Sequence, residues 1–398
     1  MTTLTALPRP RDVTGHFGLY VHVPFCSHRC WYCDFNAYDS LDHLSDAYMD
    51  ALATDIREAR SAPEGADLAR RPTITSVFIG GGTPSLVAAA GITRVMDAIR
   101  DGWDLDPHAE VTIECNPESL DAAKLDAYLA AGINRVSVGV QSLDATSLDR
   151  LGRIHSAERA VQALRLAQER GFERVSGDLI FGIPGEDDDQ WRESLEGVLA
   201  TGVGHVSCYG LTYEEGTPLH AWRRLGKVIP VSDDDSARRW EMADALLHAA
   251  GLPRYEISNW GDPSTHNGVY WECGEYLGVG AGAHSHLADL ATRDAATRSW
   301  TLRAPQRYIE AVRDGERTVA GSEEIDARTR AAETMVLGLR RAEGVSEDDF
   351  SALVGRPIDE VYGPELADGV SGGLIERDGG RVRITKPLLA DRATVLFV

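Results

Sequence analysis

The chain has 398 residues, enough for one large domain and a smaller one, and its 40 basic and 62 acidic side chains give a formal net charge of −22. So acidic a chain is not expected to attract a phosphate backbone, which excludes nucleic acid as a partner. No stretch reaches the roughly 18 uninterrupted apolar residues of a membrane span, and the N-terminal segment lacks the apolar core of a signal peptide. We therefore expect a cytoplasmic protein without a membrane span.

From Gly18 onward, short β-branched runs alternate with longer amphipathic segments, an order typical of βα units around a parallel sheet. Six strands are predicted at residues 19–23, 74–79, 111–115, 135–140, 174–180 and 206–211. Helices are predicted between them at 42–60, 119–131, 157–170 and 188–200. The pattern indicates an α/β fold with a partial (β/α)6 barrel, whose chemistry belongs at the C-terminal ends of the strands.

This rhythm stops after about Arg313, and the stretch from Asp-Gly-Glu-Arg to Ala-Gly-Ser-Glu-Glu is typical of a linker. We expect a first domain over 1–312 and a smaller one over 320–398. The second has predicted helices at 326–341 and 346–353, then a β-hairpin from 374–376 and 382–385. This outline is winged-helix-like, but its 10 basic and 15 acidic side chains give no reason to expect DNA binding.

Three of the six cysteines lie within eight positions, with the spacing C-x3-C-x2-C, directly after the first predicted strand: Cys26, Cys30 and Cys33. Six cysteines are too few for a disulfide scaffold of this length, whereas three thiolates on one loop suit a metal centre in a reducing compartment. Thiolates are the usual ligands of iron–sulfur clusters, and three of them leave one iron of a [4Fe-4S] cluster open. The alternative is a zinc site completed by His22 or His28.

Other polar or small residues also follow predicted strands. Gly80-Gly-Gly-Thr-Pro-Ser follows the second strand, where glycines let the backbone approach a ligand closely, although an ordinary turn has the same composition. Glu114 ends the third strand, Gln141 follows the fourth, Arg153 lies in the loop beyond it, and Asp178 lies near the end of the fifth. All four side chains could point into one cavity.

The cysteine spacing and the order of these motifs resemble the radical S-adenosylmethionine superfamily. The resemblance implies that the three cysteines hold a [4Fe-4S] cluster and that S-adenosylmethionine fills its open iron, with an electron donor of flavodoxin or ferredoxin type. It also implies these S-adenosylmethionine contacts: Tyr20, Gly81, Gly82, Thr83, Glu114, Gln141, Arg153 and Asp178.

A closer resemblance rests on Tyr-Val-His-Val-Pro-Phe-Cys at 20–26, Asp-Leu-Ile-Phe-Gly-Ile-Pro at 178–184, the motif at 266–271 and Gly-Val-Gly-Ala-Gly-Ala-His-Ser at 278–285. These segments are similar to the oxygen-independent coproporphyrinogen III oxidases and their sister family, the HemW heme chaperones. The oxidases carry a fourth cysteine two residues after the third, where this chain has Phe35. This difference favours the chaperone family over a true coproporphyrinogen III dehydrogenase and leaves open whether the protein is an enzyme.

The chaperone resemblance implies heme as ligand, a heme-acceptor protein as partner, and heme contacts from His266, Asn267, Tyr270 and Trp271. The alternative is an enzyme of porphyrin biosynthesis that oxidatively decarboxylates coproporphyrinogen propionates. For His266 the other interpretation is a histidine hydrogen-bonded to its neighbours. Cys273 is a weaker candidate for a heme thiolate, because free cysteines usually pack as small apolar side chains.

Overall fold

Six parallel strands form the centre of the molecule, as the sequence predicts. The computed structural model describes residues 13–64, 66, 72–288 and 296–398, and the N-terminal segment judged to lack a signal-peptide core lies largely outside them. The six strands are β1 Phe17–Val23, β2 Ile74–Gly81, β3 Leu105–Cys115, β4 Arg135–Gln141, β5 Arg174–Phe181 and β6 His205–Gly210. Each is hydrogen-bonded in parallel to the next.

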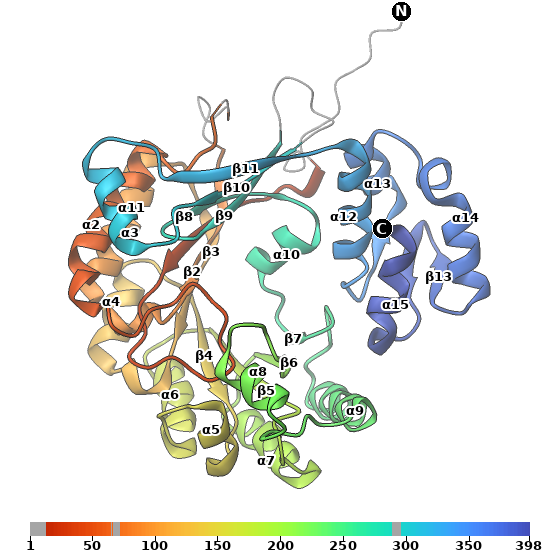
Figure 1. Cartoon of the computed structure of the whole chain (residues 1–398), viewed down its shortest axis with the longest axis horizontal. Helices are drawn as coiled ribbons and strands as arrows, with labels where there is room; N and C mark the ends of the chain where they lie inside the picture. The colour runs from red at the N-terminus through yellow and green to blue at the C-terminus, as the bar shows by residue number, and fades with distance from the viewer. Residues whose placement is uncertain (1–12, 65, 67–71, 289–295) are drawn as a thin grey trace, which may run out of the picture.

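Helices follow these strands and cover the outer side of the sheet (Figure 1). They are α2 Ser45–Glu58, α3 Ala89–Gly102, α4 Ala122–Ala130, α5 Ala145–Leu151, α6 Ala157–Glu169 and α7 Asp188–Leu199. Strand residues alternate between the two faces. Val77 and Val136 belong to the main apolar core, whereas their neighbours Ser76 and Ser137 are buried polar residues. A polar inner face is thus built into the barrel.

The sheet continues on both sides of the six strands. Among the described residues it has eleven strands, in the order β11-β10-β9-β8-β1-β2-β3-β4-β5-β6-β7. The added strands are β7 Asn259–Gly261, β8 Glu275–Val279, β9 His284–Ala288, β10 Ala296–Thr301 and β11 Val319–Ile325. Helices α8 Pro218–Arg224, α9 Asp233–Ala249, α10 Thr265–Trp271 and α11 Pro305–Arg313 accompany them.

The linker expected around residues 314–325 is wrong in its second half, because β11 is the outermost strand of the large sheet. It pairs antiparallel with β10, and most of its side chains are exposed. An edge strand with charged, solvated side chains lacks the apolar alternation by which strands are recognised in a sequence. The expected start of the second domain at residue 320 therefore falls inside the first sheet.

The C-terminal region has an apolar core of its own, which runs from Ala331 to Phe397. Its elements are α12 Ala327–Gly338, β12 Val345–Ser346, α13 Glu347–Val354, α14 Ile358–Ser371, β13 Ile375–Asp378, β14 Arg381–Ile384 and α15 Ala390–Thr394. The hairpin β13–β14 turns at Gly379 and Gly380, both with positive φ. Helices followed by a hairpin confirm the predicted winged-helix-like outline. Within the part of the chain that is described, every helix is too short or too polar to cross a lipid bilayer.

Candidate functional site

The cysteine loop follows β1 and lies at the C-terminal ends of the parallel strands. The Cys26 amide donates to the Tyr38 carbonyl at 2.9 Å, and the Cys33 amide donates to the Cys30 carbonyl at 3.2 Å. All three thiols are free, partly exposed, and line one cavity. Burial raises the pKa of Cys26 to about 11. Metal coordination needs thiolates, so a metal that binds here must displace thiol protons.

The loop that ends β2 approaches the cysteine loop through its backbone. The Thr83 amide donates to the Phe25 carbonyl at 2.7 Å, and the Thr83 hydroxyl lies 3.6 Å from Cys26 Sγ. A Cβ atom on Gly82 would lie 2.7 Å from the Phe25 carbonyl oxygen, and Gly81 has a φ of +114°. Both positions therefore need glycine for the two loops to come this close.

Two carboxylates reach the same cavity from β3 and β5. Glu114 Oε2 accepts a hydrogen bond from the Gly81 amide at 3.0 Å, and burial raises the pKa of Glu114 to about 7. Asp178 accepts hydrogen bonds from three serine hydroxyls, Ser137 at 2.8 Å, Ser176 at 2.9 Å and Ser207 at 2.9 Å. The carboxylates have lone pairs suited to hydroxyl or ammonium donors of a ligand.

Arg153 and Gln141 complete the cavity lining. Arg153 Nη1 lies 3.5 Å from Cys30 Sγ, and Nη2 donates to Asn116 Oδ1 at 2.8 Å and to the Gly139 carbonyl at 3.0 Å. Gln141 has a φ of +65°, a left-handed conformation that is uncommon outside glycine and concentrates at functional sites. A Cβ atom on Gly139 would lie 2.7 Å from Gln141 Nε2, so glycine makes room for that side chain.

Tyr20, expected at the same site, lies in the middle of β1. Its hydroxyl donates to His22 Nδ1 at 3.0 Å, and its ring centroid is 6.3 Å from that of Phe78 and 6.5 Å from that of His266. His22 Nε2 lies 2.9 Å from the Asn36 carbonyl. Both His22 nitrogens thus have partners inside the protein, and His22 could complete a zinc site at the cysteines only by giving up one of these hydrogen bonds.

The four residues expected to contact heme lie on α10, toward the N-terminal ends of the parallel strands. Glu110 of β3 accepts hydrogen bonds from the Ser264 hydroxyl at 3.0 Å, the Thr265 amide at 3.0 Å and the His266 amide at 3.1 Å. Glu110 also forms an ion pair with Arg174 at 2.7 Å. This carboxylate fixes the first turn of α10 to the barrel, at the end opposite the cysteines.

The His266 side chain is fully buried inside the barrel. Its Nδ1 is 2.9 Å from Ser76 Oγ and its Nε2 is 2.8 Å from the Tyr270 hydroxyl, while its ring stacks on Phe78 at 5.3 Å. Burial lowers the pKa of His266 to about 4, so the imidazole is neutral, the form that ligates metals. Ligation of a heme iron requires His266 to give up one of these two hydrogen bonds.

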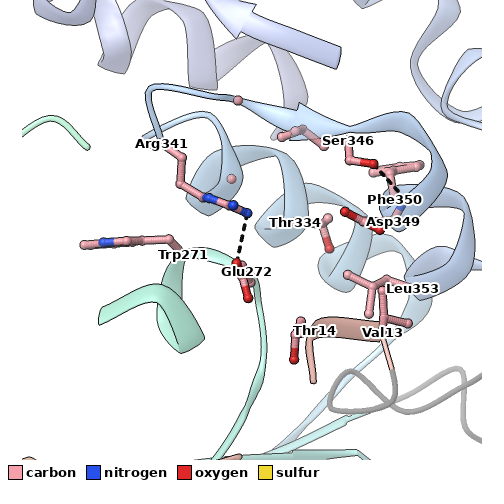
Figure 2. Close-up of a pocket in the computed structure, with 13 residues that line it drawn as sticks. Val13, Thr14, Trp271, Glu272, Thr334, Arg341, Ser346, Asp349, Phe350 and Leu353 are labelled. Carbon is pink, nitrogen blue, oxygen red and sulfur yellow. Dashed lines mark hydrogen bonds and ion pairs between the residues drawn. The ribbon is translucent and has the colours of Figure 1, made fainter. Parts of the chain in front are cut away.

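Asn267 and Trp271 lie on the partly exposed side of α10. Trp271 faces the C-terminal region, where Arg340 lies 4.7 Å from its ring centroid. Figure 2 shows Trp271 at the edge of a groove in which Glu272 forms an ion pair with Arg341 at 3.3 Å. This groove has a volume of about 190 Å³, against about 130 Å³ for the cysteine cavity. The two cavities differ in their chemistry, because the three thiols, the glycine loop and both carboxylates line the cysteine cavity and not the groove at Trp271.

Comparison with known proteins decides the family. The Radical SAM superfamily model matches residues 20–198, and the HemN C-terminal domain model matches 325–387. Heme chaperone HemW of Mycobacterium tuberculosis is 38% identical over 383 residues, which cover 94% of this chain and 93% of that protein. The chain belongs to the HemW heme chaperone family.

Two further relatives are informative. HemW of Escherichia coli is 31% identical over 380 residues, or 92% of this chain and 94% of that protein. The structure of coproporphyrinogen III oxidase (HemN) from Escherichia coli superposes with a TM-score of 0.78 at 20% identity and covers 97% of this chain and 92% of that one. This second likeness shows the fold. Membership of the radical SAM superfamily implies a [4Fe-4S] cluster and S-adenosylmethionine.

The cavity fits both groups. Three thiols supply three cluster ligands, and Gly81 and Gly82 bring backbone close to the thiols where any Cβ would collide or strain the chain. Sequence reasoning missed Asn116, which holds Arg153, although it follows the third strand directly. It also missed the serines around Asp178, which the two-residue alternation of the inner face could have identified.

Proposed function

We propose that this chain is a heme chaperone that binds heme and passes it to an acceptor protein, while the [4Fe-4S] cluster and S-adenosylmethionine control the transfer. The observation that carries the proposal is the similarity to HemW of Mycobacterium tuberculosis over 93% of that protein's length. The Cys33-Asp-Phe35 sequence supports it, since phenylalanine stands where the oxidases have a further cysteine. We place the protein in the cytoplasm, with a flavodoxin-type or ferredoxin-type electron donor.

The proposed roles at the cavity follow from donor and acceptor chemistry. Cys26, Cys30 and Cys33 would hold the cluster, which when bound and reduced supplies the electron that cleaves the sulfonium bond. The Gly81–Thr83 backbone would face the amino group of S-adenosylmethionine. Glu114 and Asp178 would accept from its hydroxyl or amino groups, together with the Gln141 amide, and Arg153 would donate to its carboxylate.

The proposed heme ligand is His266, with Asn267, Tyr270 and Trp271 beside it. The His266 imidazole points into the barrel and is hydrogen-bonded to Ser76 and Tyr270, so heme binding requires α10 to move and bring the imidazole out of the barrel. The neutral state of His266 supports ligation, because only an unprotonated nitrogen binds iron.

The test is anaerobic reconstitution of the cluster, followed by titration with hemin and, separately, incubation with coproporphyrinogen III, S-adenosylmethionine and a reductant. We expect stoichiometric heme binding in absorption spectra and no carbon dioxide or protoporphyrinogen. Formation of protoporphyrinogen would instead identify a decarboxylating enzyme and overturn the chaperone proposal.

A further inference from the structure

A second group of metal-ligating side chains lies away from the cysteine cavity, where the large sheet contacts α12. Cys273 follows α10, His286 belongs to β9, and Glu333 belongs to α12. One ligand atom from each, a sulfur, an imidazole nitrogen and a carboxylate oxygen, all lie within 4.8 Å of one another. The function proposed above uses none of the three.

The His286 imidazole is oriented as metal-binding histidines are. Its Nδ1 lies 2.9 Å from the Gly274 carbonyl, which can only accept, so Nδ1 carries the proton and Nε2 has the lone pair. The His286 side chain is only 4% exposed, and its Nε2 has no hydrogen-bond partner among the described residues. Histidine ligands typically donate one ring N–H to a backbone carbonyl and bind the metal with the other nitrogen. An unpaired buried acceptor is otherwise unfavourable.

Cys273 has a conformation that packing alone does not require. Its φ is +52° at the end of α10, a position where helices commonly end with glycine. Its amide donates to the Tyr270 carbonyl at 3.1 Å, and its side chain is buried. Its thiol is hydrogen-bonded to Thr334 and lies near the Glu333 carboxylate, so a metal ion that binds the sulfur would replace the thiol proton and compete with the Thr334 hydrogen bond.

Glu333 supplies the anionic oxygen and the contact with solvent. Its side chain is 23% exposed, and its Oε1 pairs with Arg298 at 2.5 Å. Arg298 and Arg330 are the cations that face Cys273. A divalent ion adds two positive charges to the site, and the Cys273 thiol loses one proton to solvent, so the net charge of the site rises by one. The Cys273 thiolate and the Glu333 carboxylate together carry two negative charges, which balance the charge of the ion.

We propose that Cys273, His286 and Glu333 bind a zinc ion, with water as the fourth ligand. Sulfur, nitrogen and carboxylate oxygen in tetrahedral arrangement are the ligand set that zinc prefers, and bonds of about 2.0–2.3 Å separate such ligand atoms by about 3.3–3.6 Å. The three ligand atoms lie at most 4.8 Å apart, so each would have to move closer to the others by roughly 1 Å when the ion binds. The bound ion would join β9, the end of α10 and α12, and thus hold the C-terminal domain against the barrel.

The experiment uses full-length protein with a reconstituted cluster, so that iron occupies Cys26, Cys30 and Cys33. After incubation with zinc chloride and gel filtration, zinc and iron per chain are measured together with zinc-edge X-ray absorption. We compare wild type with Cys273→Ala and His286→Gln, and with the control Cys208→Ala, which removes another buried thiol.

We expect one zinc per wild-type chain with a single sulfur ligand at about 2.3 Å, and the same zinc content in Cys208→Ala. Cys273→Ala and His286→Gln should lose roughly 100-fold or more in zinc affinity, because each removes a direct ligand, while iron per chain stays constant and shows that both variants fold. Wild-type zinc at background, or variants that retain wild-type zinc with intact iron content, would refute the site.

Discussion

The substitution Ser76→Ala tests whether His266 leaves the barrel when heme binds. Ser76 Oγ and His266 Nδ1 are 2.9 Å apart and fully buried, so loss of this bond should lower the free energy of unfolding by about 1 kcal/mol. If heme binding releases the imidazole, the substitution destabilises only the heme-free state, because the heme-bound state has already lost the hydrogen bond between Ser76 and His266. Heme affinity should then rise about fivefold, since 1.4 kcal/mol corresponds to a factor of ten.

The assay is hemin titration, paired with urea unfolding of the same preparations. Ser147→Ala is the matched control, because Ser147 is also fully buried but its hydroxyl has no partner among the described residues; we expect unchanged heme affinity there. A Ser76→Ala variant that is less stable yet binds heme as wild type does would show that His266 stays inside the barrel. In that case its role is to close the barrel, and the iron ligand must be sought elsewhere.

Three further predictions concern the cysteine cavity. Cys30→Ala should abolish cluster assembly, seen as loss of bound iron and of the brown absorption. Gly82→Ala should weaken S-adenosylmethionine binding at least tenfold in equilibrium dialysis, because the added Cβ would lie 2.7 Å from the Phe25 carbonyl oxygen. With a pKa of about 7, Glu114 is mostly protonated at pH 6 and ionised at pH 8, so S-adenosylmethionine affinity should rise with pH across this range. Glu114→Gln should remove that dependence. Because its pKa is raised from 4.5 to about 7 in the folded state, the contribution of Glu114 to the free energy of unfolding falls as pH rises through this range.

The sequence predicts the six central strands well because one face of each strand packs into the apolar core, so that apolar residues recur at every second position, as Val136, Val138 and Val140 do in β4. It does not reveal β7 to β11, since these strands are short or partly exposed. The clearest case is β11, where Glu323 and Glu324 make an edge strand look like a linker. Only the folded structure shows that β11 pairs with β10, where Arg298 lies opposite Glu323.

For the candidate site, the residues at strand ends were predictable because parallel strands bring their C-terminal ends to one edge. The surroundings of His266 were not. Its partners Ser76 and Glu110 lie 190 and 156 residues away in the chain, and a local motif has no information about contacts of that range. The same limit hid the group of Cys273, His286 and Glu333, whose members belong to three separate elements.

The position of α10 connects the two proposals and leads to one more prediction. Its first turn is fixed to the barrel by Glu110, and Cys273 is the second residue after its last turn. A zinc ion on Cys273 and His286 would hold that end of α10 to β9 and so oppose the movement that frees His266. We therefore expect zinc loading to weaken heme binding, and heme to weaken zinc binding by the same factor, as linkage requires.

Hemin titrations of cluster-loaded protein with and without zinc measure the first factor, and zinc titrations with and without hemin measure the second. Equal affinities in both pairs would show that α10 does not couple the two sites, because a shared movement cannot leave both unchanged.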